Sequence, residues 1–112
     1  MCIFAIEKME QDKIIESIKE AAGHSLPTGS SLWLYGSRAR GDAHPDSDYD
    51  LLILLDRGTS MADADRAAYD LCEVGYDNGV EINPHIYFKD QWASWSFSPF
   101  YKNVEQDKVV LR

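Results

Sequence analysis

The sequence predicts an α/β domain in which helices pack on a small mixed β-sheet. Residues 32–35 and 49–55 are short apolar segments with the composition of strands. Segments with helical periodicity lie on both sides of this pair, and strands combined with helices in this order are typical of α/β domains. With 112 residues the chain is long enough for one domain with one core, so we expect a single domain over residues 1–112.

The first element is expected to be a helix over residues 11–22. Its apolar side chains recur at helical spacing from Ile14 to Ala22, and lysine and glutamate fill positions between them. Gly23 follows directly, and a glycine just after a periodic segment is a typical helix end. We therefore expect a loop over residues 24–31 before the first strand.

A second long helix is expected over residues 61–76, because small residues recur on one of its faces and would allow close packing on a sheet. The Asp-Asn-Gly sequence at 77–79 is typical of a turn. Residues 80–88 follow as a third strand. Pro84 lies inside this strand and cannot donate a backbone hydrogen bond, so we expect the strand at an edge of the sheet or at a bulge.

The C-terminal part is expected to form short helices and a last strand. Residues 89–96 are interpreted as a helix, and Ser98 followed by Pro99 has the order of an N-cap and a first helical residue. Residues 108–111 are interpreted as a short strand. The aromatic side chains between 87 and 101 either close the core or form an exposed patch for a partner, and the sequence leaves both interpretations open.

The charge and composition exclude several classes of function. The net charge of −8 argues against extended contact with a nucleic-acid backbone, which requires a basic surface. The chain contains no apolar run of about 18 residues, so no membrane-spanning segment is expected. The two cysteines form neither a disulfide framework nor a metal-binding spacing, which is typical of a reducing compartment. We therefore expect a cytoplasmic protein.

A pair of acidic residues opens the second strand. Asp48 and Asp50 stand two positions apart, and side chains two apart on a strand point to the same face. Two ionised carboxylates beside leucine and isoleucine require a compensating charge. Magnesium is usually bound by one or two carboxylates together with phosphate oxygens. The sequence therefore predicts a Mg²⁺ site at Asp48 and Asp50.

The turn after the first strand has the residues of a phosphate-binding site. Gly36 allows the backbone to approach a ligand closely, and a helical turn that starts at Ser37 would direct its backbone N–H groups at an anion. Arg38 and Arg40 add cationic donors, and arginine can bind phosphate with two hydrogen bonds. A phosphate site beside a metal site predicts phosphoryl or nucleotidyl transfer.

The order Gly36-Ser37, ten residues, then Asp48-Tyr49-Asp50 resembles the signature of the nucleotidyltransferase superfamily that includes DNA polymerase beta. The surrounding Gly-Ser-Arg-Ala-Arg-Gly and Ser-Asp-Tyr-Asp-Leu sequences resemble its minimal nucleotidyltransferase branch. The resemblance implies the polymerase-beta-like nucleotidyltransferase fold. It also implies Mg²⁺-dependent transfer of a nucleoside monophosphate, expected to be AMP, from a nucleoside triphosphate to a hydroxyl.

The resemblance implies a role for each residue of the site. Asp48 and Asp50 would hold the metal, with two Mg²⁺ ions expected when substrate is bound. Ser37 and the backbone of Gly36 would hold the triphosphate, and one of the two arginines that follow would neutralise the leaving pyrophosphate. Members of the minimal branch often act as antitoxins that modify a toxin with a HEPN domain. A HEPN-domain protein is therefore the expected partner, and self-association is left open.

The superfamily usually supplies a third carboxylate from a neighbouring strand, and the strand expected over residues 80–88 offers two candidates. Glu81 and Asn83 would point to the same side of that strand. We favour Glu81 as the third catalytic and metal-binding residue, because an ionised carboxylate is the better ligand for Mg²⁺. Comparison from the downstream aromatic segment would instead place Asn83 there. That placement would favour the alternative function, a nucleotide- or protein-binding module with weak or no catalysis.

Overall fold

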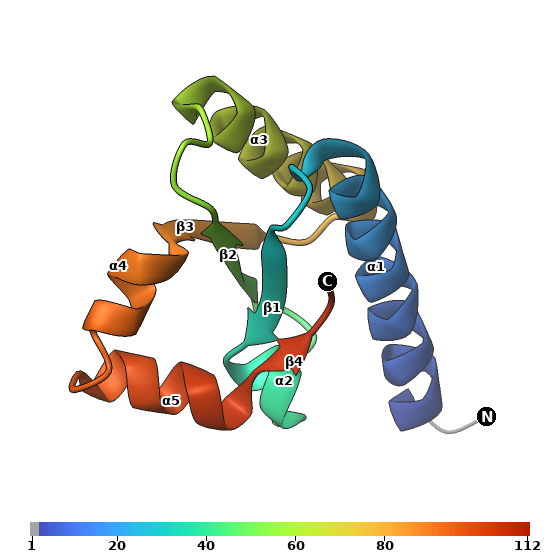
Figure 1. The fold of residues 1–112 in the computed structure, drawn as a ribbon. Helices are drawn as coiled ribbons and strands as arrows, with labels where there is room; N and C mark the ends of the chain where they lie inside the picture. Colours follow the sequence, from blue (N-terminus) through green and yellow to red (C-terminus); the bar gives the residue numbers. More distant parts are fainter. Residues whose placement is uncertain (1–2) are drawn as a thin grey trace.

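A four-stranded sheet forms the centre of the fold, and helices pack on both of its faces (Figure 1). The computed structural model describes residues 3–112. The elements in chain order are α1 Ile3–Ser25, β1 Ser31–Tyr35, α2 Ser37–Arg40, β2 Tyr49–Leu55, α3 Met61–Asn78, β3 Ile82–Phe88, α4 Lys89–Ser94, α5 Pro99–Asp107 and β4 Val109–Val110.

The sheet is mixed, as the sequence predicts, with the strand order β3-β2-β1-β4. β1 runs antiparallel to β2 and β4, whereas β2 runs parallel to β3. Pro84 lies in β3, at an edge of the sheet, which confirms its predicted edge position. β2 has the predicted bounds and is buried along most of its length, because it lies between two other strands.

One face of the sheet packs against α1 and α3, which lie against each other in Figure 1. Strand side chains alternate between the two faces, so Leu32, Leu34 and Leu51 enter this core. Ile18 of α1 and Leu71 of α3 pack on them and are fully buried. Burial of each large apolar side chain contributes about 1.5–3 kcal/mol, so this core is the main stabilising feature of the fold.

The opposite face carries a smaller core under α4 and α5. Leu52 of β2 packs there with Trp92 of α4 and Val104 of α5. Other aromatic side chains of this segment are exposed, and that of Phe97 is exposed by 77%. The aromatic segment thus closes a core and also leaves apolar surface in solvent. Asp50 is the next β2 residue on this face beyond the smaller core.

Helix α1 is longer than predicted, and Gly23 does not end it. The helix extends from Ile3 to Ser25. Ala22 and Leu26 are both buried one helical turn apart, and the amide of Leu26 donates to the carbonyl of Ala22 at 2.9 Å. The buried contacts continue the helix through Gly23, although glycine disfavours helix by about 1 kcal/mol relative to alanine.

The other boundaries differ from the prediction by a few residues. α3 ends at Asn78, where Gly79 adopts the left-handed conformation with φ 67. β3 begins at Ile82, later than predicted, and its parallel register with β2 aligns Asn83 with Asp50. Ser98 caps α5 as predicted, because its Oγ accepts a hydrogen bond from the amide of Tyr101.

Two further observations bear on the predicted class of protein. In the part of the chain that the structure describes, no helix is both long and apolar enough to cross a membrane. Cys72 is a free thiol, and Cys2 lies outside the described residues. Burial raises the pKa of the Cys72 thiol, so it remains protonated at neutral pH.

Candidate functional site

The predicted acid pair lies at the start of β2, on the face opposite to α1 and α3. Asp50 pairs with Tyr35 of β1 and with Asn83 of β3. Tyr49, between the two acids, is only 1% exposed and belongs to the core under α1 and α3. Because strand side chains alternate, Asp48 and Asp50 both point to the other face. Both residues are half-buried, which strengthens their charge interactions relative to bulk water.

The turn at Gly36 brings the predicted phosphate-binding backbone against this acid pair. Gly36 has φ 74 and ψ −157, a conformation that is essentially restricted to glycine. A β-carbon at this position would lie 2.7 Å from Oδ2 of Asp50, which is closer than real β-carbons approach other atoms. α2 begins immediately, and the amide of Arg40 donates to the Gly36 carbonyl at 3.0 Å. The amide of Ser37 lies at the N-terminal start of this helical turn.

Asn83 stands beside the acid pair. It aligns with Asp50 in the parallel register of β2 and β3, and its Nδ2 donates to Oδ2 of Asp48 at 3.1 Å. Glu81 is exposed and precedes β3. It lines a small hollow of about 160 Å³ that Asp48 also lines. Within residues 3–112, no three His, Cys, Asp or Glu side chains are placed to hold one metal ion.

The expected group of three carboxylates, Asp48, Asp50 and Glu81, is therefore not assembled in this structure. Asn83 aligns with Asp50 and donates to Asp48, whereas Glu81 is exposed and lines the hollow that it shares with Asp48. Asn83 is also the residue that comparison from the downstream aromatic segment would place at the third-carboxylate position. The catalytic role of Glu81 stays a prediction.

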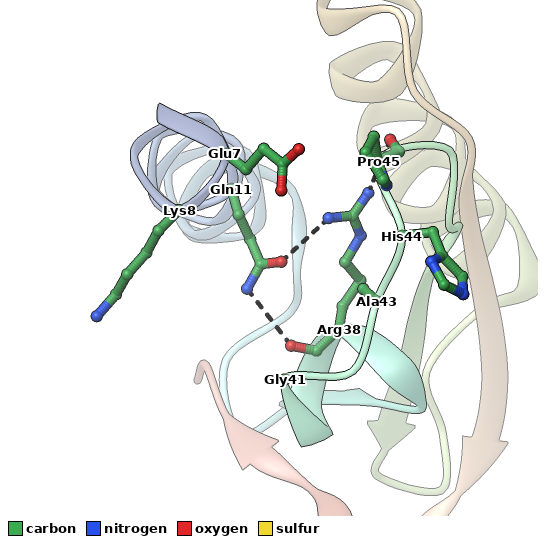
Figure 2. Close-up of a pocket in the computed structure, with 8 residues that line it drawn as sticks. All are labelled: Glu7, Lys8, Gln11, Arg38, Gly41, Ala43, His44 and Pro45. Carbon is green, nitrogen blue, oxygen red and sulfur yellow. Dashed lines mark hydrogen bonds between the residues drawn. The ribbon is translucent and has the colours of Figure 1, made fainter. Parts of the chain in front are cut away.

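The Arg38 side chain extends toward α1 and the loop before β2, on the Tyr49 side of that strand (Figure 2). Its Nη1 donates to Oε1 of Gln11 at 3.1 Å. Its Nη2 donates to the carbonyls of Pro45 and Ser47 at 3.2 and 2.9 Å, and its Nε donates to the same Ser47 carbonyl at 3.2 Å. The guanidinium carbon lies 4.4 Å from the centre of the Tyr49 ring. Each nitrogen of this guanidinium thus has a partner within the protein.

Arg40 lies at the surface of the same turn. Its Nε pairs with Asp42 and its Nη1 pairs with Asp107 of α5, both at 3.2 Å. The hydrogen bonds to Asp42 and then to Asp107 raise the pKa of Arg40. Exposed ion pairs contribute little to stability and exchange readily with solvent ions. The pair with Asp42 can therefore exchange for an incoming anion at little cost, whereas the Asp107 side chain is only 18% exposed.

Aromatic side chains border Asp50 on the same face of the sheet. The ring centre of Tyr35 lies 6.3 Å from that of His85 and 5.8 Å from that of Phe100. Burial, followed by the charges of Asp50 and Tyr87, raises the pKa of Tyr35 to about 12. The phenol is therefore protonated at neutral pH. Sequence reasoning missed this group, and its available signal was the position of Tyr35 directly before the Gly-Ser turn.

Comparison with known proteins identifies the family. Residues 11–110 match the sequence model of the family described as nucleotidyltransferase domain. The chain belongs to this family. The predicted resemblance is thereby confirmed over most of the sequence.

Curated relatives of this nucleotidyltransferase domain match half of the chain. The bifunctional uridylyltransferase/uridylyl-removing enzyme of Bordetella pertussis strain Tohama I is 48% identical to it over 56 residues. The enzyme of the same name from Bordetella parapertussis strain 12822 is 46% identical over 56 residues. The matched part is 50% of this chain and 6% of each relative, so the similarity concerns a small segment of much longer proteins.

Solved structures share the fold of this nucleotidyltransferase domain. A crystal structure of a toxin–antitoxin with AMP-PNP has a TM-score of 0.60 at 16% identity, and the match covers 88% of this chain and 72% of that chain. A candidate nucleotidyltransferase from Sulfolobus solfataricus has a TM-score of 0.55 at 20% identity, and the match covers 93% of this chain and 84% of that chain. These similarities confirm the predicted nucleotidyltransferase fold.

The acid pair of the nucleotidyltransferase domain fits a hard divalent cation. Asp48 and Asp50 supply oxygen ligands, and Gly36 leaves beside Asp50 a space that a β-carbon would fill. Mg²⁺ is usually bound by one or two carboxylates and completes its coordination with water and phosphate. Asn83 adds no charge and donates a hydrogen bond to Asp48. The residues therefore suit a Mg²⁺ ion that arrives with phosphate better than an ion held by protein groups alone.

Proposed function

We propose that this nucleotidyltransferase domain binds a nucleoside triphosphate with Mg²⁺ and transfers a nucleoside monophosphate to a hydroxyl group. The close approach of Gly36 to Asp50 carries the proposal, because it joins the phosphate-binding turn and the acid pair in one site. Membership of the nucleotidyltransferase domain family supports the same class of reaction.

We assign phosphate binding, metal binding and contact with the leaving pyrophosphate to different residues of the site. Ser37 and the amides of the Gly36 turn would bind phosphate oxygens, since the start of a helical turn presents N–H groups to an anion. Asp48 and Asp50 would hold Mg²⁺, which when bound neutralises charge on the phosphates. Arg40 is our candidate for the leaving pyrophosphate, because its guanidinium lies at the surface of the turn and its ion pair with Asp42 is exposed and exchangeable.

The acceptor hydroxyl is proposed to belong to a partner protein. One structure with this fold is of a toxin–antitoxin with AMP-PNP, which supports both a protein partner and AMP as the transferred group. A toxin with a HEPN domain is the partner that we propose. The curated relatives are uridylyltransferases, so UMP is the competing choice for the transferred group.

Asn83 supports a second candidate function, which is nucleotide binding with little transfer. The attacking hydroxyl must be positioned or deprotonated, and a carboxylate can do this whereas an amide cannot take up the proton. Asn83 aligns with Asp50 and donates to Asp48, which supports the proposal that it stands in place of a third carboxylate. Transfer then depends on whether Glu81 or a carboxylate of the partner reaches the hydroxyl.

The deciding experiment is to incubate the pure protein with each α-labelled nucleoside triphosphate, Mg²⁺ and a candidate acceptor, namely a protein encoded by a neighbouring gene, with a HEPN-domain protein as the expected case. We expect Mg²⁺-dependent labelling of the partner by one triphosphate, and calorimetry measures binding of the same nucleotide. A variant with Asp48→Asn and Asp50→Asn is the inactive control. Binding without labelling of any acceptor supports the second candidate function. Failure to bind any of the four triphosphates with Mg²⁺ overturns both.

The third catalytic group is tested by two substitutions on either side of Ile82. Glu81→Gln keeps the shape and removes the charge, and we expect single-turnover transfer to fall by about 10²-fold while triphosphate binding falls less. Asn83→Asp places a carboxylate in register with Asp50 and is expected to raise transfer. Glu16→Gln on the exposed surface of α1 is the control for loss of charge. Full activity of Glu81→Gln would remove Glu81 from the mechanism.

A further inference from the structure

We propose that Arg38 is a positioning residue, which fixes the loop over residues 41–48 and thereby the place of Asp48, and that it does not bind phosphate. The proposal rests on the proposed function in one respect, namely that Asp48 is a metal ligand. The sequence favours the opposite assignment, because Arg38 directly follows the Gly-Ser turn. The contacts of its guanidinium decide between the two.

Arg38 holds the peptide bond that leads into Asp48. The Ser47 carbonyl belongs to this peptide bond, and both Nε and Nη2 of Arg38 donate to it, at 3.2 and 2.9 Å. The loop has a turn of its own, in which the Ser47 amide donates to the His44 carbonyl at 2.9 Å and the His44 amide donates to Oγ of Ser47 at 2.8 Å. Arg38 contacts a second carbonyl of this turn, because its Nη2 also donates to the Pro45 carbonyl.

On its other side, the guanidinium of Arg38 is anchored by Gln11 of α1. Gln11 accepts from Nη1 of Arg38 at 3.1 Å, and Nε2 of Gln11 donates to the Arg38 carbonyl at 3.4 Å (Figure 2). The Gln11 side chain therefore binds both the side chain and the backbone of Arg38. Planar guanidinium donors suit this arrangement, and the single ammonium of lysine cannot reach all of these acceptors at once.

These contacts lie in a cleft between α1 and the loop. The cleft has a volume of about 360 Å³, and Gln11 lines it from α1, whereas Arg38, His44 and Pro45 line it from the other side. Figure 2 shows Gln11 and Arg38 bridging this cleft from α1 to the loop. The bridge of Gln11 and Arg38 is thus a polar link across this cleft between α1 and the loop.

The guanidinium of Arg38 lies on the Tyr49 face of the sheet. It stacks 4.4 Å from the ring centre of Tyr49, whose side chain is buried under α1 and α3. Asp48 and Asp50 point to the other face. A phosphate held by the Gly36 turn beside Asp50 would meet Arg38 only if the guanidinium left its stacking and hydrogen-bonding partners.

The first test uses no nucleotide, so its result does not depend on the proposed function. Hydrogen exchange of the Ser47 amide is measured in the wild type and in Arg38→Lys, together with global stability. We expect this amide to exchange about tenfold faster in Arg38→Lys, which corresponds to the loss of roughly one net hydrogen bond. Arg57→Lys is the matched control, because Arg57 also stacks 4.4 Å from an aromatic ring, Phe88, and pairs with a carboxylate. Unchanged exchange in Arg38→Lys overturns the proposal.

The second test separates positioning from phosphate binding. The Mg²⁺ concentration needed for half-maximal triphosphate binding is measured for Arg38→Lys, Gln11→Ala and the double variant. We expect each single variant to raise it about threefold to tenfold and the double variant to add little, because the two residues act through one bridge. A phosphate ligand predicts instead that Gln11→Ala changes nothing and that Arg38→Lys, which keeps the charge, retains most affinity. If the wild type binds no triphosphate, the proposed function fails and the exchange result alone decides the role of Arg38.

Discussion

Gly36 meets two geometric requirements at the same position. Its φ of 74 and ψ of −157 exclude ordinary side chains, and a β-carbon there would press on Oδ2 of Asp50 at 2.7 Å. Each requirement alone favours glycine, and together they bring the amide groups of the turn next to the acid pair. The local sequence of the turn is therefore explained by the placement of Asp50.

Replacement of Gly36 tests this contact at the scale of one residue. We expect Gly36→Ala to lower the free energy of unfolding by about 1–3 kcal/mol and to weaken binding of Mg²⁺ with nucleotide by about tenfold or more. Gly58→Ala is the matched control, because Gly58 has φ 97 but a β-carbon there meets nothing within 4 Å. Denaturant unfolding and calorimetry measure both effects. If Gly36→Ala binds nucleotide as Gly58→Ala does, the contact with Asp50 is not part of the site.

At the scale of elements, two helical glycines with different surroundings explain how α1 and α3 are built. A β-carbon at Gly75 of α3 would lie 2.7 Å from the Val80 carbonyl and 3.2 Å from the Ile82 side chain. This close approach lets α3 lie against the start of β3, whose register presents Asn83 to the acid pair. Among the residues that the structure describes, a β-carbon at Gly23 of α1 would meet only the Arg112 side chain, at 3.9 Å.

The two glycines are therefore expected to respond in opposite directions to the same substitution. Gly75→Ala should lower the free energy of unfolding by about 1–3 kcal/mol, because backbone at Val80 must move. Gly23→Ala should raise it by about 0.5–1 kcal/mol, because alanine is the better helix former and the space is open. Urea unfolding of both variants measures the difference. A destabilised Gly23→Ala would contradict the helical placement of that residue.

The junction between α4 and α5 predicts a dependence of stability on pH. Oε1 of Glu105 accepts from the indole of Trp92 at 3.1 Å, and Oε2 pairs with Lys108 at 2.7 Å. Burial opposes ionisation of Glu105, but the hydrogen bonds from Lys108 and Trp92 outweigh it and lower the pKa of the carboxyl below its ordinary value of 4.5. A lowered pKa stabilises the folded state above the unfolded value, and this stabilisation disappears as pH falls through the folded value.

We therefore expect the wild type to be more stable than Glu105→Gln at pH 7, by about 1 kcal/mol or less. The difference should shrink below about pH 4.5 as the carboxylate becomes protonated. Thermal unfolding of both proteins between pH 7 and pH 3 measures the effect. A difference that stays constant over this range would show that the ionised form of Glu105 makes no contribution.

At the scale of the whole molecule, local pattern predicted the fold and the acid pair. The apolar run of β2, the edge position of Pro84 and the alternation that places Asp48 and Asp50 on one face all follow from neighbouring residues. The partners of Arg38 do not, because Gln11 lies 27 residues away and meets it only through the packing of α1. The placement of Asn83 likewise depends on the register in which β3 pairs with β2.

The acid pair is also expected to couple the stability of the whole molecule to Mg²⁺ and nucleotide. Without a cation the carboxylates of Asp48 and Asp50 repel each other, so the Asp48→Asn, Asp50→Asn double variant should unfold at a higher temperature than the wild type. Its residue 48 still has a side-chain oxygen to accept the bond from Asn83. With Mg²⁺ and triphosphate at about 100 times the dissociation constant, the wild type should gain about 2.7 kcal/mol and the variant nothing. Asp65→Asn with Asp77→Asn, on the exposed surface of α3, is the charge-matched control and should keep this gain. If the acid-pair variant gains as much as the wild type, Asp48 and Asp50 do not hold the metal.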